Sequence, residues 1–181
     1  MNDDPVLDLE ARRRIYAHIL DQPGAYLREI QRAVDMPMGM LEYHLGRLEK
    51  AGLVTVLQED HKRFFPEKMD ARDKRYVALL RQKACRDVVV HLLTRPGASH
   101  KELRSATALL PSTLSYYLAR LVDAGLASRE KDGRLTRYSL VDAERAQGVL
   151  VQYRPTFLDR VLDRVLEGID EVHGGRDPDE V

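Results

Sequence analysis

The chain has 181 residues, of which 44% are hydrophobic, with 29 basic and 29 acidic side chains and therefore no formal net charge. This length predicts one domain of ordinary size or two small ones, and the apolar content is too high for a disordered chain. The zero balance argues against a polycation that coats nucleic acid, although a basic face can be offset by an acidic one. The single cysteine excludes an internal disulfide and a zinc site made of several thiolates.

No segment of the sequence approaches the roughly 20 apolar residues that a helix needs to cross a bilayer. The first residues, Met1 to Pro5, are acidic and polar, whereas a signal peptide begins with a basic and then an apolar segment. We therefore expect a cytoplasmic protein with no membrane partner.

The sequence repeats itself at a spacing of 73 positions. Residues 12–54 align with residues 85–127 without a gap, and 16 of the 43 positions are identical. Pro23-Gly24-Ala25, for example, aligns with Pro96-Gly97-Ala98. Because chance would give only a few identities, the sequence indicates the duplication of a small domain.

The first copy shows helical apolar spacing followed by a β-like segment. In chain order, the pattern predicts a helix over 7–20 with Asp8 as N-cap, a short helix over 27–34, a third helix over 38–51 ended by Gly52, and a hairpin with strands 53–57 and 63–65.

The second copy repeats this plan. Its predicted elements are a helix over 84–93, a short helix over 101–108, a third helix over 112–124, and strands 126–129 and 137–140 around a turn at 131–134. Three helices and a hairpin, with a tight break between the second and third helices, are typical of a winged helix-turn-helix. The expected fold class is mainly α with small β-hairpin wings (α+β), with two such domains in tandem plus C-terminal helices.

The sequence outside the two copies also shows helical patterns. Asp70 can cap a helix that starts at Ala71, and apolar spacing near four continues from Tyr76 to Leu92, so this connector is expected to run into the next helix. Its charged residues are better explained as a solvated face than as a DNA contact. The expected organisation is a winged domain at 1–66, a helical linker at 67–83, a second winged domain at 84–141, C-terminal helices at 142–173 and a disordered tail at 174–181.

An apolar stripe runs along the last predicted helix, from Phe157 to Ile169. A helix outside both winged domains must bury such a stripe, either on its own chain or against a second copy. Because helices often mediate dimers in winged-helix proteins, we expect a homodimer formed through the C-terminal helix.

Residues 110–126, LPSTLSYYLARLVDAGL, resemble the recognition-helix signature of ArsR/MarR-like winged-helix regulators. Residues 38–54, MGMLEYHLGRLEKAGLV, resemble the same motif but depart from it at the N-terminal positions. The tandem arrangement, together with residues 95–103, is similar to tandem winged helix-turn-helix transcriptional regulators of archaea. The resemblance covers roughly residues 7–140. It implies a sequence-specific double-stranded DNA-binding transcriptional regulator with recognition helices in the major groove.

In the second copy, Leu114, Leu118 and Leu121 predict the buried side of the third helix. The intervening side chains then share an outer face near the helix end that enters the major groove in helix-turn-helix proteins: Ser112, Thr113, Ser115, Tyr116 and Arg120. Further candidate DNA contacts lie at the start of the preceding helix and on the wing, namely His100, Lys101, Lys131, Arg134 and Arg137. The alternative is that these hydroxyls only solvate the helix and that Tyr116 covers the core.

The first copy gives a weaker indication of DNA binding. Its candidate contacts are Arg28, Met40, Glu42, Tyr43, Arg47, Lys62 and Arg63. Glu42 repels phosphate but can accept from a cytosine amine, and Met40 can touch a thymine methyl or pack against a protein. The alternative for this copy is a role in dimerisation or in docking a partner.

The sequence gives no sign of catalysis or of a cofactor. It lacks a Gly-rich phosphate loop, an HExxH motif and a nucleophile elbow. The histidines are scattered, and His18 and His91 share a repeat position, which favours a structural role for both. No metal site is expected, and Cys85 is expected at a partly buried helix position. We predict that the protein is not an enzyme.

Two classes of function remain, and the charge distribution bears on them. Residues 1–66 carry a net −2, residues 67–83 +3, residues 84–141 +4 and residues 142–181 −5. The second copy is therefore expected to supply most of the attraction to DNA. The alternative is a tandem winged-helix scaffold for protein interaction, of the chromosome-condensation, sorting-complex or RNA polymerase-associated type, for which the basal transcription machinery is the candidate partner.

Overall fold

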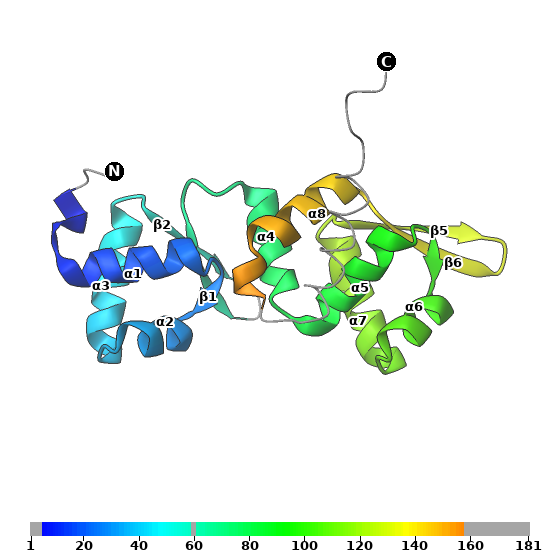
Figure 1. The fold of residues 1–181 in the computed structure, drawn as a ribbon, viewed down its shortest axis with the longest axis horizontal. Helices are drawn as coiled ribbons and strands as arrows, with labels where there is room; N and C mark the ends of the chain where they lie inside the picture. Colours follow the sequence, from blue (N-terminus) through cyan, green and yellow to red (C-terminus); the bar gives the residue numbers. More distant parts are fainter. Residues whose placement is uncertain (1–4, 59–60, 158–181) are drawn as a thin grey trace, which may run out of the picture. The chain divides into compact units, whose positions relative to one another are not determined.

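The computed structural model describes residues 5–58 and 61–157. The chain divides into two compact units, unit 1 (Met1–Ala78) and unit 2 (Leu79–Val181). Each unit contains the same succession of helices and strands (Figure 1). Most of the predicted C-terminal stripe, the dimer surface expected there and the tail at 174–181 lie outside the described residues.

Unit 1 begins with a 3-10 turn, followed by helices and a small antiparallel sheet. Its elements are η1 (Pro5–Asp8), α1 (Glu10–Asp21), β1 (Ala25–Tyr26), α2 (Leu27–Val34), α3 (Met38–Lys50), β2 (Val54–Gln58), β3 (Lys62–Pro66) and α4 (Ala71–Leu80), whose last two residues fall in unit 2. Helix α1 starts after Leu9, not after Asp8 as predicted, because the preceding residues form the 3-10 turn.

Unit 2 has the same plan with a longer hairpin. Its elements are α5 (Lys83–Thr94), β4 (Ala98–Ser99), α6 (His100–Thr107), α7 (Pro111–Asp123), β5 (Ala127–Asp132), β6 (Leu135–Leu140), α8 (Ala143–Gln152) and η2 (Arg154–Thr156). The two strands of the hairpin extend to a two-residue connection at Gly133-Arg134, so they are longer than predicted. In Figure 1 this hairpin projects beyond the helices of unit 2.

The leucine pattern forms the core of each unit. In unit 1, Leu41 and Leu48 of α3 are fully buried and belong to the same core cluster as Ile15 and Ile19 of α1. In unit 2, Leu114, Leu118 and Leu121 of α7 are likewise buried. Burying an aliphatic side chain of this size contributes about 1.5–3 kcal/mol relative to leaving it exposed. Both units are therefore winged helix-turn-helix folds with packed cores, as predicted.

Glycines end α3 and α7 in the same way. Gly52 and Gly125 adopt left-handed backbone conformations, with φ of 67° and 70°. The next amide then turns back into the helix: Leu53 N donates to Leu48 O at 3.0 Å, and Leu126 N donates to Leu121 O at 2.9 Å. A residue with a side chain is strained in this conformation, which explains why both copies have glycine here.

Each sheet has a third, two-residue strand that the sequence pattern does not predict. The strand orders are β1-β3-β2 and β4-β6-β5, with all pairs antiparallel. In the first sheet Tyr26 lies opposite Arg63, and in the second Ser99 lies opposite Arg137. This pairing anchors each hairpin to the start of the second helix.

The connector contains a helix, α4, but this helix does not run into the first helix of unit 2. Asp70 does cap α4, because its Oδ1 accepts from the amide of Arg72 at 2.8 Å. The helix nevertheless stops at Leu80, and α5 begins at Lys83 after a turn. The buried guanidinium of Arg86 donates to Leu80 O at 2.7 Å, so it satisfies a carbonyl at the end of α4.

Candidate nucleic-acid interface

Helix α7 presents the polar face that the sequence predicts for unit 2. Ser112, Ser115 and Tyr116 are exposed, and Thr113 and Arg120 are half-buried. These residues point away from the core because the leucines on the opposite side are buried. Pro111 occupies the first turn, where the fixed backbone angle of proline suits a helix start. The N-terminal half of α7 therefore exposes hydroxyl groups beside a helix N-terminus, which favours anions.

Two contacts organise this face. The Arg120 guanidinium donates to the Tyr116 hydroxyl at 3.1 Å and lies 5.7 Å from the centre of the Tyr116 ring. His100 at the start of α6 lies 3.0 Å from Ser115, measured from Nε2 to Oγ. The second contact joins the helix before the turn to the helix after it. The surface formed by Ser112, Thr113, Ser115, Tyr116 and Arg120 is called the α7 face below.

The predicted basic DNA contacts outside α7 differ in solvent exposure and in the bonds that they already make. Lys101 on α6, Lys131 on β5 and Arg134 at the hairpin tip are exposed. Arg137 on β6 is half-buried: its Nη1 donates to Gly97 O at 3.0 Å and its Nε to Asp132 at 2.7 Å. The bond and charge of Asp132 raise the pKa of Arg137 above its usual value. Arg137 therefore holds the base of the wing as well as carrying a charge on its surface.

Unit 1 presents a different outer face on α3. Met40 and Tyr43 are 52% and 60% exposed, and Glu42 and Arg47 are also exposed. The face thus combines two large apolar side chains with one charge of each sign. Arg28 on α2 and Lys62 on β3 are exposed as well. We refer to Met40, Glu42, Tyr43 and Arg47 as the α3 face.

The structure corrects the prediction for Arg63. This side chain is only 5% exposed, and its Nη1 donates to Gly24 O at 3.1 Å. The guanidinium also donates to the Tyr26 hydroxyl and lies 4.1 Å from the centre of the Tyr26 ring. A guanidinium placed in this way supports the fold and is not presented to a DNA backbone.

Burial shifts the pKa of several other reactive side chains among the described residues. Cys85 on α5 is fully buried, more than the partial burial predicted, and burial raises the pKa of its thiol to about 12. Burial, followed by the charge of Arg12, lowers the pKa of His44, and burial, followed by the charge of Arg95, lowers the pKa of His91. Within residues 5–58 and 61–157, no group of three or more potential ligands is placed to hold a metal ion.

The structure defines a class: each unit is a winged helix-turn-helix with an exposed face on its third helix. Residues 9–77 match a protein family described as an N-terminal HTH domain (HVO_0163). The match runs from the last residue before α1 to the last but one residue of unit 1, so unit 1 is similar to this family of HTH domains. None of the helices in the described part of the chain is both long and apolar enough to cross a membrane.

A curated relative extends the likeness into unit 2. The chain is 31% identical over 140 residues to an uncharacterised HTH-type transcriptional regulator of Methanocaldococcus jannaschii, which covers 76% of this chain. The aligned part of this chain spans only 35% of the length of that relative. A crystal structure of the DIP2311 protein from Corynebacterium diphtheriae aligns with 72% of this chain and 26% of its own, at 16% identity and a TM-score of 0.31. That score is too low to bear on fold or function.

Proposed function

We propose that the protein is a sequence-specific regulator of transcription that binds double-stranded DNA and inserts α7 into the major groove. The observation that carries this proposal is the α7 face, where Ser112, Ser115 and Tyr116 are exposed at the N-terminal half of the third helix. Hydroxyl groups can bond to base edges or phosphates, and Arg120 suits guanine or phosphate. The HTH family match and the relative described as a transcriptional regulator support the same function.

The charges around α7 fit this role. Lys101, Lys131 and Arg134 are exposed on α6 and the wing, where a helix-turn-helix protein meets the flanking phosphates. Residues 84–141 carry a net charge of +4. Each phosphate neutralised releases counterions, so binding through this surface weakens steeply as salt is added.

The wider organisation belongs to the same proposal. Two DNA-binding domains, at 1–66 and 84–141, read one site in tandem, in the manner of ArsR/MarR-like winged-helix proteins. Residues 142–181 carry a net −5, which keeps this segment away from phosphates, while its apolar stripe from Phe157 to Ile169 suits it to a homodimer contact. The protein then works in the cytoplasm, has no catalytic activity and needs no cofactor.

The test begins with selection of bound duplexes from a random pool, followed by fluorescence polarisation at several salt concentrations. Ser115→Glu combined with Tyr116→Ala should weaken binding at least about tenfold, because a carboxylate then faces phosphate and a contact surface is removed. Ala143→Glu is the matched control, since it adds the same charge at an exposed site on α8. Absence of binding at low salt, or equal affinities for the two variants, contradicts the proposal.

The α3 face favours a second candidate, a scaffold for protein interaction. Met40 and Tyr43 are 52% and 60% exposed, and such side chains are common in protein interfaces. In that case unit 1 docks a protein, for example in the basal transcription machinery. Recovery of a stable protein partner that is lost in Met40→Ser with Tyr43→Ser, without any DNA in the complex, favours the scaffold over the regulator.

A further inference from the structure

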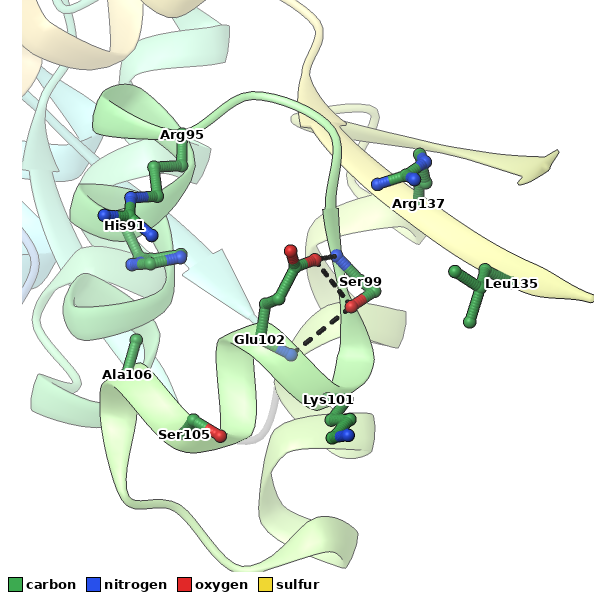
Figure 2. A pocket seen from close by; sticks show the side chains of 9 residues that line it. All are labelled: His91, Arg95, Ser99, Lys101, Glu102, Ser105, Ala106, Leu135 and Arg137. Carbon is green, nitrogen blue, oxygen red and sulfur yellow. Dashed lines mark hydrogen bonds between the residues drawn. The ribbon is translucent and has the colours of Figure 1, made fainter.

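Unit 2 has a cavity of about 670 Å³, open to solvent, between the end of α5, the start of α6 and strand β6 (Figure 2). Its lining residues are His91, Arg95, Ser99, Lys101, Glu102, Ser105, Ala106, Leu135 and Arg137. The volume lies within the range of about 300–1,000 Å³ that is usual for small-molecule sites. The α7 face and the wing tip are not part of this lining, so the cavity is a separate feature of unit 2.

The charges in the cavity favour an anion. Arg95, Lys101 and Arg137 contribute three basic groups, and Glu102 contributes one carboxylate. That carboxylate is already engaged, because it accepts from the amide and the hydroxyl of Ser99 at 2.7 Å and 2.6 Å. These two bonds lower the pKa of Glu102 and fix its place at the start of α6. The planar fork of Arg95 suits a carboxylate or a phosphate, whereas Arg137 already donates through Nε to Asp132 and through Nη1 to Gly97 O and adds mainly its charge.

The lining also includes a small apolar surface. Leu135 and Ala106 line the same cavity, so it offers contacts to a carbon skeleton as well as to a charge.

Unit 1 provides an internal comparison. Tyr26 lies opposite Arg63 in its sheet, as Ser99 lies opposite Arg137 in the sheet of unit 2. The Tyr26 ring packs against the Arg63 guanidinium and leaves it only 5% exposed. In unit 2 the small side chain of Ser99 leaves this space open.

The charge at this site also differs between the two units. Arg95 of unit 2 aligns with Gln22 of unit 1 in the repeat. Unit 1 thus has the aromatic ring of Tyr26 and the neutral amide of Gln22. At the equivalent positions, unit 2 has open space beside Ser99 and the cation of Arg95.

We propose that this cavity of unit 2 binds a small organic anion that carries a carboxylate or a phosphate and acts as an effector. Binding itself does not depend on the proposed function. The regulatory consequence does rest on it: Lys101 and Arg137 are candidate DNA contacts, and an anion that neutralises them reduces the attraction of unit 2 to phosphate. The effector therefore weakens DNA binding.

The cavity is tested by calorimetric titration of the full chain with four probes: inorganic phosphate, glycerol 3-phosphate, succinate and citrate. We expect at least one organic anion to bind, and Ser99→Tyr to weaken it at least about tenfold by placing the ring of unit 1 in the cavity. Ser99→Ala is the matched control for size, because it removes the same hydroxyl but leaves the space open, and it should weaken the anion clearly less than Ser99→Tyr does.

A second variant makes the test independent of the folding of Ser99→Tyr. Arg95→Gln introduces the residue of unit 1 at an exposed position directly after α5 and should also weaken the anion about tenfold. Three results overturn the proposal: no probe binds at about 10 mM, inorganic phosphate binds as tightly as every organic probe, or Ser99→Tyr and Arg95→Gln both bind like the parent.

A separate arm tests regulation. The anion that binds best is added to a polarisation titration with the selected duplex, and it should weaken DNA binding in the parent but not in Arg95→Gln. If the parent binds the anion and also binds DNA equally with and without it, the regulatory half is wrong. If the chain binds no DNA, the proposed function fails while calorimetry still decides the cavity.

Discussion

Replacing Arg63 with methionine separates the structural role of this side chain from the DNA contact that the sequence suggests. Arg63 is 5% exposed, donates to Gly24 O at 3.1 Å, and lies 4.1 Å from the centre of the Tyr26 ring. Methionine keeps most of the aliphatic volume, so the substitution mainly removes the polar contacts. The neighbouring Lys62 is exposed, which makes Lys62→Met a matched control that removes the same formal charge.

The size of the effect follows from these contacts. Leaving the buried Gly24 carbonyl without its partner costs about 1–3 kcal/mol. Losing the contact between the guanidinium and the Tyr26 ring costs about 0.5–2 kcal/mol. Part of this loss is offset because a buried cation no longer has to be desolvated. We expect Arg63→Met to lower the free energy of unfolding of unit 1 by about 2–3 kcal/mol, and Lys62→Met to change it by less than about 0.5 kcal/mol.

Hydrogen–deuterium exchange followed by mass spectrometry is the suitable assay because it reports each unit separately. Peptides from β1 to β3 should exchange faster in Arg63→Met, and peptides from unit 2 should be unchanged. In a DNA titration, Lys62→Met should reduce the salt slope by about one if the wing of unit 1 contacts a phosphate. The reasoning is refuted if Arg63→Met leaves the exchange of unit 1 unchanged and reduces the salt slope instead.

Three further predictions concern stability and reactivity. Ala108 has a left-handed backbone with φ of 53°, so Ala108→Gly should raise the melting temperature by a few degrees. Ala119→Gly, at an exposed helical site, should lower it. Calorimetry in which both variants melt at a lower temperature than the parent contradicts this prediction. Burial lowers the pKa values of His44 and His91, so the unfolded chain takes up more protons below about pH 6.5. Stability should therefore decrease from pH 7.5 to pH 5, and the urea midpoint of a variant with both histidines changed to glutamine should depend less on pH. Burial raises the pKa of Cys85 to about 12, so its thiol should react with Ellman's reagent only after unfolding in urea, and rapid labelling of the native protein would disprove the buried position.

The sequence predicts the helices well because each buries a stripe of aliphatic residues with a clear period. Leu41, Leu45 and Leu48 place α3 by themselves, and the glycine that follows fixes its end. The same apolar spacing does not predict where the connector helix ends. Its apolar spacing continues from Tyr76 to Leu92, yet the chain turns between α4 and α5, and periodicity does not register a turn that keeps the spacing.

Other features depend on contacts between distant residues. Strands β1 and β4 have two residues each, too few to show alternation, and they exist because β3 and β6 pair with them. The role of Arg63 depends on Gly24, 39 positions earlier in the chain. The cavity of unit 2 depends on the size of Ser99 beside a strand nearly 40 residues away, and only the alignment of the two copies gave a signal, a serine in place of a tyrosine.

The matching ends of α3 and α7 make the α3 face and the α7 face interchangeable. Both helices have 13 residues, begin and end at positions 73 apart, and bury leucines at the same places. Tyrosine and arginine recur at equivalent outer positions, Tyr43 with Tyr116 and Arg47 with Arg120, whereas Glu42 is replaced by Ser115. Transplanting the outer residues of one helix onto the other should therefore leave the buried leucines of both cores in place. The outer face of each unit can then be exchanged without rebuilding the domain that carries it.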